Sequence, residues 1–206
     1  MKNKIGYVVL AVLFLADLVL LSREDLHFFR LFTKPLLVPV IIAIYLSERK
    51  HAGINSYFLA GLIFSFLGDT FLLFKWGFLP GLGSFLFAHV LYILSFVKLR
   101  KAKMYGSLPF ILAYLLFLVY FLHPYLHEME IPVIVYGITI STMAYFSLCT
   151  QNRWLIYGAF LFVISDSLLS FNLFVSYSTI LEQIVMVTYV FAQISLVNGM
   201  ISKKST

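Results

Sequence analysis

The sequence is short of the residues that keep a soluble protein in solution. Only 12% of its 206 residues are charged and 62% are hydrophobic, whereas about a quarter of a typical soluble domain is charged. The single cysteine, Cys149, excludes an intrachain disulfide and a cysteine-based zinc cluster. A Gly-x-Ser-x-Gly motif is also absent, so a serine hydrolase of that kind is not supported. We therefore predict an integral membrane protein with a single transmembrane domain over residues 1–206.

Apolar segments fill most of the chain, and each is close to the ~20 residues that a spanning helix needs. Eight can be drawn, at about 5–21, 31–47, 54–74, 81–98, 106–122, 131–149, 154–174 and 180–201. The sequence thus predicts an all-α membrane protein with eight transmembrane helices.

Basic residues are shared unequally between the two sides of this predicted bundle. Only Arg23, Arg30 and Lys75 lie on one side, with Lys34 just inside the second helix. Eleven lie on the other side: Lys2, Lys4, Arg49, Lys50, Lys98, Arg100, Lys101, Lys103, Arg153, Lys203 and Lys204. Because lysine and arginine are enriched in cytoplasmic loops, both termini are predicted to be cytoplasmic. The net charge of +6 is then explained by these loops, and we expect no nucleic-acid partner.

One stretch of the chain recurs. Residues 61–73 place Asp69 inside an apolar run, and residues 158–170 place Asp166 at the same point, 97 residues later. The same offset aligns Pro35 with Pro132 and Tyr92 with Tyr189. We predict two four-helix halves, about 1–103 and 104–206, related by an axis along the membrane normal. Chance similarity between apolar helices is the alternative.

Polar side chains inside the predicted helices are expected to face the bundle interior, since a charge at a helix centre costs roughly 2.5–3.5 kcal/mol. With both termini inside, Asp17, Lys34, Asp69 and Glu182 lie in the outer half of the bilayer. The other polar positions are His89 and Tyr92 on the fourth helix, Ser165 and Asp166 on the seventh, and Tyr189 and Gln193 on the eighth. We predict one polar cavity open towards the outer face, in which Lys34 pairs with Asp69 or Glu182.

Each of these residues also has a purely structural interpretation. A lone intramembrane aspartate can hold a neighbouring serine or tyrosine, and His89 can be a simple polar contact. Asp17 and Glu182 lie near helix ends and could reach the interface.

Five short segments, in this order, resemble a known family. They are Thr33-Lys34-Pro35-Leu36, Leu67-Gly68-Asp69, Phe87-Ala88-His89-Val90-Leu91-Tyr92, the run 161–169 around Asp166, and Tyr189-Val190-Phe191-Ala192-Gln193. From about Leu31 to Ile201 the chain is similar to the YhhN-like lysoplasmalogenase family of membrane proteins. The first predicted helix has no counterpart in this resemblance. What the resemblance implies is a hydrolase of the vinyl ether bond of lysoplasmalogens, in the inner membrane of a bacterium, with lysophospholipid as substrate.

Vinyl ether hydrolysis needs an acid that protonates carbon and a carboxylate that stabilises the resulting cation and activates water. Burial and a like charge nearby favour the protonated form of a carboxyl group, so two aspartates in one apolar cavity can divide these tasks. Our hypothesis is that Asp69 and Asp166 are catalytic. Lys34, His89, Tyr92, Ser165, Tyr189, Gln193 and Glu182 are predicted to bind or position the substrate. No metal or other cofactor is expected.

Two other functions use intramembrane carboxylates. A small proton-coupled transporter is the main alternative, because buried acids also serve as proton relays. An intramembrane aspartyl protease is ranked lower because the chain has no Gly-x-Gly-Asp motif. The oligomeric state is left open.

Overall fold

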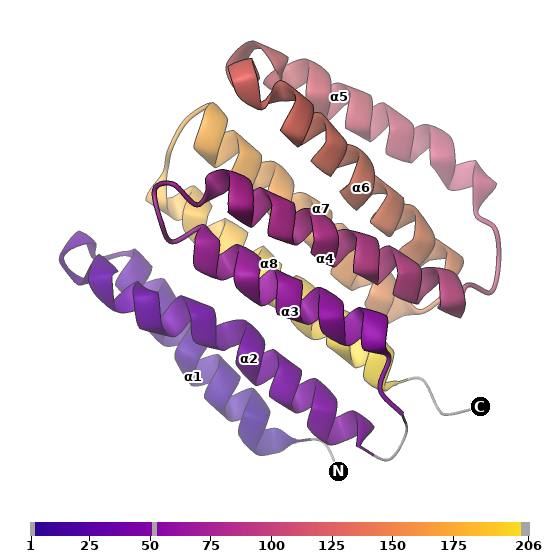
Figure 1. Cartoon of the computed structure of the whole chain (residues 1–206), viewed down its shortest axis with the longest axis horizontal. Helices are drawn as coiled ribbons and strands as arrows, with labels where there is room; N and C mark the ends of the chain where they lie inside the picture. The colour runs from indigo at the N-terminus through magenta and orange to yellow at the C-terminus, as the bar shows by residue number, and fades with distance from the viewer. Residues whose placement is uncertain (1–2, 51–52, 203–206) are drawn as a thin grey trace.

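The computed structural model describes residues 3–50 and 53–202, and in this part of the chain all regular structure is helical (Figure 1). Lys2, Lys203 and Lys204, predicted to be cytoplasmic, lie outside the described residues. Eight α-helices follow one another: α1 (Lys4–Leu21), α2 (Arg30–Arg49), α3 (Ser56–Phe71), α4 (Phe78–Leu99), α5 (Leu108–Leu126), α6 (Glu130–Cys149), α7 (Arg153–Phe174) and α8 (Thr179–Ile201). Three short 3₁₀ helices join some of them: η1 (Glu24–Phe29), η2 (Tyr105–Ser107) and η3 (His127–Met129).

The predicted helices correspond to the observed ones within a few residues at each end. Six helical runs are long and apolar enough to cross a membrane, if residues 105–149 are counted as one run, and α3 is apolar but has only 16 residues. Within 105–149, His127 has a φ of 45° and ends α5, so that α5 and α6 fold into a hairpin (Figure 1). The all-helical prediction is confirmed, while eight membrane crossings remain a prediction.

The helices pack in a pattern that recurs in the two halves of the chain. The closest pairs are α3 with α4 and α7 with α8. α2 packs against α3 and α8, and α6 packs against α7 and α4 in the corresponding way. α1 then covers α2 on one side of the bundle, and α5 covers α6 on the other (Figure 1).

Glycines allow the two central pairs to approach closely. A β-carbon on Gly61 of α3 would lie 2.5 Å from the ring of Tyr92 on α4. A β-carbon on Gly158 of α7 would lie 2.8 Å from the backbone nitrogen of Leu196 on α8. Small residues have this role in membrane helix pairs generally, so the repeated glycines keep α3 beside α4 and α7 beside α8.

The two covering helices expose large apolar side chains. On α5, Phe110 is 78% exposed and Tyr120 is 83% exposed, and on α1 Ile5 is 79% exposed. Continuous apolar surface of this extent suits contact with lipid and not with water. The start of α1 lies beside the end of α8, because the Tyr7 hydroxyl donates to Asn198 Oδ1 at 2.9 Å.

Candidate active site in the helix bundle

A cavity of about 150 Å³ lies between α2, α3, α7 and α8. Both predicted catalytic residues line it, Asp69 from α3 and Asp166 from α7. Four further residues of the predicted site line the same cavity: Lys34, Ser165, Glu182 and Tyr189. The repeat thus brings two carboxyl groups, 97 positions apart in the chain, to one cavity.

Asp69 is at the end of a directed chain of hydrogen bonds. The Tyr189 hydroxyl donates to Asp69 Oδ2 at 2.6 Å, and Gln193 Nε2 donates to the Tyr189 hydroxyl at 3.3 Å. The Tyr92 hydroxyl donates to Gln193 Oε1 at 3.2 Å. Because the Tyr92 proton is used there, the Ser65 hydroxyl, 3.2 Å away, donates to Tyr92. Every donor in this buried chain points towards Asp69, so Tyr92 and Gln193 support the site without lining the cavity.

Asp166 has a tyrosine donor of its own. The Tyr136 hydroxyl of α6 donates to Asp166 Oδ2. Tyr136 was not among the predicted site residues, since a tyrosine in a spanning segment looks the same in the sequence whether it faces lipid or the interior. Ser165, next to Asp166, donates to the backbone oxygen of Val185 at 3.0 Å and so ties α7 to α8 beside the cavity.

Asp166 also lies where this cavity, whose lining contains the charged groups, meets an apolar pocket. A second, smaller pocket of about 30 Å³ between α4, α6 and α7 includes Asp166 and Tyr136 in its lining. The rest of this pocket is almost entirely apolar: Leu72, Phe78, Leu82, Phe85, Val133, Leu169, Ser170, Leu173 and Phe174. A molecule with a polar head and an apolar chain would therefore cross from one environment to the other at Asp166.

His89 lies outside the cavity lining. Its side chain is fully buried, with its ring 4.7 Å from that of Phe162 and 5.3 Å from that of Tyr136, centroid to centroid. Within the described part of the chain neither ring nitrogen has a side-chain partner. His89 therefore packs beside Tyr136, the residue that donates to Asp166.

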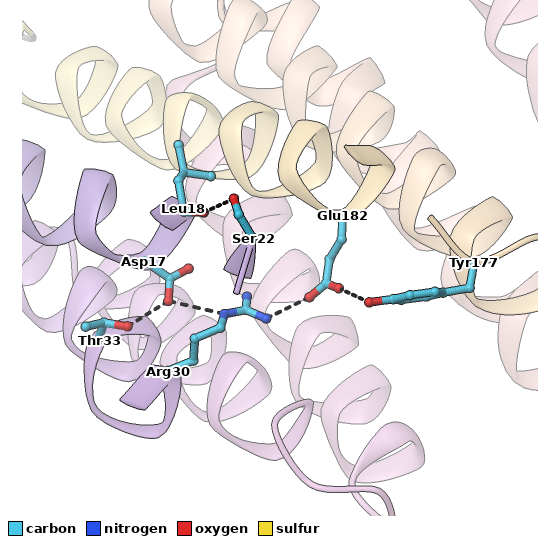
Figure 2. Close-up of polar contacts among 7 residues, drawn as sticks. All are labelled: Asp17, Leu18, Ser22, Arg30, Thr33, Tyr177 and Glu182. Atoms are coloured by element: carbon cyan, nitrogen blue, oxygen red, sulfur yellow. Dashed lines mark hydrogen bonds and ion pairs between the residues drawn. The ribbon is translucent and has the colours of Figure 1, made fainter. Parts of the chain in front are cut away.

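A network of charges lies beside the cavity and includes Glu182 of its lining (Figure 2). Arg30, in the first turn of α2, donates from Nη1 to Glu182 Oε1 at 2.9 Å, and its Nε lies 3.5 Å from Asp17 Oδ1. Thr33 donates to the same Asp17 oxygen at 2.8 Å, and the Tyr177 hydroxyl donates to Glu182 Oε2 at 3.1 Å. Glu182 and Tyr177 line the cavity, while Arg30 and Asp17 are buried behind them.

One sequence-based expectation is wrong here. Glu182 pairs with Arg30 and not with Lys34, because Arg30 belongs to α2 and points inwards and is not part of an outer loop. Asp17 is completely buried, which agrees with a position facing the bundle interior and excludes the alternative that it reaches the interface. The signal that could have identified Arg30 is its spacing of four residues from Lys34, which puts both cations on one face of α2.

Lys34 forms no salt bridge within residues 3–50 and 53–202, and it lines the cavity. Tyr177 lies in the loop after α7, where desolvation and then the Glu182 carboxylate raise the pKa of its phenol above 10.0. It is therefore an O–H donor at neutral pH. In the described residues, no three histidine, cysteine, aspartate or glutamate side chains gather as a metal-binding group.

Comparison with known proteins gives a consistent set of relatives. A sequence profile described as the YhhN family matches residues 29–200. The protein named lysoplasmalogenase TMEM86B of Homo sapiens is 26% identical over 182 residues, which are 84% of this chain and 76% of the relative. Its namesake in Rattus norvegicus is 30% identical over 158 residues, 75% of this chain and 66% of the relative. The protein of the same name in Mus musculus is 29% identical over 161 residues, which are 76% of this chain and 69% of the relative. No solved structure matches the chain.

Proposed function

The chain belongs to the YhhN family, and on this premise we propose that it is a membrane-embedded lysoplasmalogenase. The proposed reaction cleaves the vinyl ether bond of a lysoplasmalogen with water, giving a fatty aldehyde and glycerophosphoethanolamine or glycerophosphocholine. The observation that carries the proposal is the pair Asp69 and Asp166 at one cavity, with Asp166 at its border with an apolar pocket. The names of the curated relatives support the same activity.

The geometry supports one orientation of the substrate. The glycerophosphate end would lie in the polar cavity, with its phosphate near Lys34, and the alkenyl chain would follow the apolar pocket towards the lipid. Pockets that enclose a whole ligand have volumes of roughly 300–1,000 Å³. At about 150 Å³, this cavity would hold the head of the lipid, with the chain outside it.

The two carboxyl groups then have different tasks. Asp166, on the chain side, would give its proton to the vinyl carbon next to the alkyl chain, so that the cation forms on the carbon bound to oxygen. Asp69, on the headgroup side, would stabilise this oxocarbenium ion and take a proton from the attacking water. In the hemiacetal that results, Asp69 would return its proton to the glycerol oxygen while Asp166 takes the proton of the hydroxyl group. The bond between carbon and the glycerol oxygen then breaks, the alcohol and the aldehyde leave, and both carboxyl groups are back in their starting states. A positioned acid or base typically contributes about 10²–10⁴-fold to a rate.

Side chains around the pair would hold it in place. Tyr189 and Tyr136 each fix one carboxyl group by a hydrogen bond. Gln193, Tyr92 and Ser65 in turn orient Tyr189, and Ser165 fixes the distance between α7 and α8. His89 would act only by packing against Tyr136.

We extend the proposal to the topology. Eight membrane crossings, cytoplasmic termini and two four-helix halves agree with the number of α-helices and with the recurring helix contacts. We take the membrane to be the inner membrane of a bacterium. In this arrangement the cavity lies in the half of that membrane that faces away from the cytoplasm.

The decisive experiment identifies products by mass spectrometry. The purified protein is incubated with lysoplasmalogens and, separately, with 1-acyl lysophospholipids of the same headgroups. We expect aldehyde and glycerophospho-headgroup from the alkenyl lipids only. Aldehyde release should fall by at least about 100-fold in both Asp69→Asn and Asp166→Asn.

The matched control is Asp25→Asn, which removes an exposed carboxyl group of η1 outside the cavity. It should leave the rate unchanged. Near-normal turnover in either cavity variant would refute the catalytic pair.

The transporter alternative is less well supported, since the curated relatives carry the name of a hydrolase. Proton-dependent flux of a lysolipid into liposomes, without any aldehyde formed, would favour it over the hydrolase.

A further inference from the structure

Glu182 is an acidic group held in place at the wall of the cavity. Its Oε1 accepts from Arg30 at 2.9 Å and its Oε2 accepts from Tyr177 at 3.1 Å (Figure 2). An ionised carboxylate has about four lone-pair positions, so these two donors leave acceptor capacity on both oxygens. The side chain is 21% exposed and lines the cavity. A carboxylate fixed in this way is ready to accept hydrogen bonds from a ligand.

The charges behind Glu182 do not cancel its charge. Arg30 is a single cation in contact with two carboxylates, Glu182 and Asp17. With these three groups ionised, the network carries a net charge of −1. Arg30 Nη2 and Asp17 Oδ2 are buried and have no hydrogen-bond partner within the described residues. Such a buried network is costly to the fold, and Arg30, shared between two carboxylates, neutralises Glu182 only in part.

Lys34 gives the same cavity a positive group. It stands one helical turn after Arg30 on α2, which is about 6 Å along the axis, and it forms no salt bridge within the described part of the chain. The cavity therefore presents both a cation, Lys34, and a carboxylate, Glu182, to one ligand, as a zwitterionic headgroup requires.

We propose that Glu182, oriented by Arg30 and Tyr177, is the binding site for the amine of the lipid headgroup, and that it selects a primary ammonium over a quaternary one. This inference rests on the proposed function, because it takes the substrate to be a lysophospholipid. Arg30 and Tyr177 are positioning residues that act through Glu182.

The preference for a primary amine follows from the groups that surround Glu182. A primary ammonium donates up to three hydrogen bonds to carboxylate oxygens, whereas a trimethylammonium group donates none and is usually bound by a cage of aromatic faces. Tyr177 is the aromatic residue bonded to Glu182. The two other rings that line the cavity belong to its Asp69 end, where Tyr189 donates to Asp69 and Phe85 packs against Tyr189.

The test compares three alkenyl lysolipids with the same chain, which carry ethanolamine, choline or a bare phosphate. We expect kcat/KM to be higher for ethanolamine than for choline in the wild-type protein. In Glu182→Gln the ratio of kcat/KM for ethanolamine to that for bare phosphate should fall about tenfold. Glu182→Asp, which keeps the charge, should retain more of this ratio. Because the ratio is measured within one preparation, it does not depend on the fraction of folded protein.

Glu128→Gln is the matched control, since it removes an exposed carboxylate of η3 outside the cavity, and it should keep the wild-type ratio. An unchanged ratio in Glu182→Gln would overturn the amine site while leaving the hydrolase intact.

Failure of the proposed function gives a different result, namely no aldehyde from any alkenyl lipid with the wild-type protein. The amine site is then tested by native mass spectrometry with saturated 1-O-alkyl lysolipids that carry ethanolamine or a bare phosphate. Selective loss of ethanolamine-lipid binding in Glu182→Gln would support the site, and equal retention of both lipids would refute it.

Discussion

At the scale of single residues, both carboxyl groups of the cavity, Asp69 and Asp166, receive a hydrogen bond from a tyrosine. Tyr189 on α8 serves Asp69 and Tyr136 on α6 serves Asp166. The two tyrosines do not correspond under the offset of 97 residues, which aligns Tyr189 with Tyr92. The two halves thus have the same tyrosine–aspartate bond but form it with tyrosines at non-equivalent positions. Tyr92, the equivalent of Tyr189, instead donates to Gln193 in the series of hydrogen bonds that ends at Asp69.

Removal of the tyrosine hydroxyls should slow the reaction without unfolding the protein. In Tyr189→Phe and Tyr136→Phe a hydrogen bond to a carboxyl group is lost, worth about 1.5–3 kcal/mol when the partner is charged. We expect kcat for aldehyde release to fall at least about tenfold, with a smaller change in KM. Tyr120→Phe, an equivalent change at a residue that is 83% exposed on α5, is the control. Equal rates in all three variants would contradict the assigned role.

The buried ion pair predicts an asymmetric effect on stability. Arg30→Gln leaves Asp17, which is completely buried, with Thr33 as its hydrogen-bond donor. An uncompensated buried charge typically costs about 3–5 kcal/mol. Asp17→Asn leaves Arg30 its bond to Glu182 and should cost less, about 1–3 kcal/mol. Unfolding of the purified variants in detergent measures the difference, and the reverse order would mean that Asp17 does not depend on Arg30.

The parts of the site that the sequence did not reveal are those set by side-chain direction. Hydropathy separates loops from helices, but Arg30 stands at that boundary and its direction depends on how α2 meets α8. Tyr136 was missed for a related reason, because aromatic residues suit both lipid and interior positions. Asp69 and Asp166 were predictable, since a carboxyl group in an apolar run has a large free-energy cost and occurs twice at the same point.

At the scale of helices, the pairs α3–α4 and α7–α8 depend on glycine. In Gly158→Ala the new β-carbon would lie 2.8 Å from a backbone atom of α8, so the helices must separate. Overpacking of this kind costs about 1–3 kcal/mol, and we expect a lower thermal midpoint together with reduced activity.

Gly83→Ala on α4 is the matched control. A β-carbon at Gly83 would meet nothing within 4 Å, and alanine is the better helix former by up to about 1 kcal/mol. The stability of this variant should be unchanged or higher. A similar loss in both glycine variants would show that helix contact is not the cause.

Helix positions themselves were predictable, because apolar length is a strong signal in a membrane protein. The ends of the helices were less predictable. The apolar run predicts α3 over 54–74, whereas the structure has it over Ser56–Phe71. Residues 72–74 remain apolar while the backbone leaves the helix before Trp76, and apolar content alone does not distinguish the last turn of a helix from the loop after it.

At the scale of the whole molecule, the topology can be tested by labelling. Cys149 is the one cysteine in the sequence and is buried, so Cys149→Ser provides a background for new cysteines. In intact cells, an impermeant maleimide should label Glu128→Cys in the loop between α5 and α6, but not Lys101→Cys between α4 and α5. After lysis both should react. Labelling of Lys101→Cys before lysis would invert the proposed orientation.

The directed hydrogen bonds that end at Asp69 have one further consequence. Of the four donors in that chain, three are hydroxyl groups, which can rotate their protons, and one is the amide of Gln193. An amide accepts at one end and donates at the other, so Gln193 gives the whole series its polarity. If this group turned over, the Tyr189 proton would be drawn towards Gln193 and Asp69 would lose its donor, with no helix displaced. One torsion angle of a buried side chain thus sets which protons face Asp69.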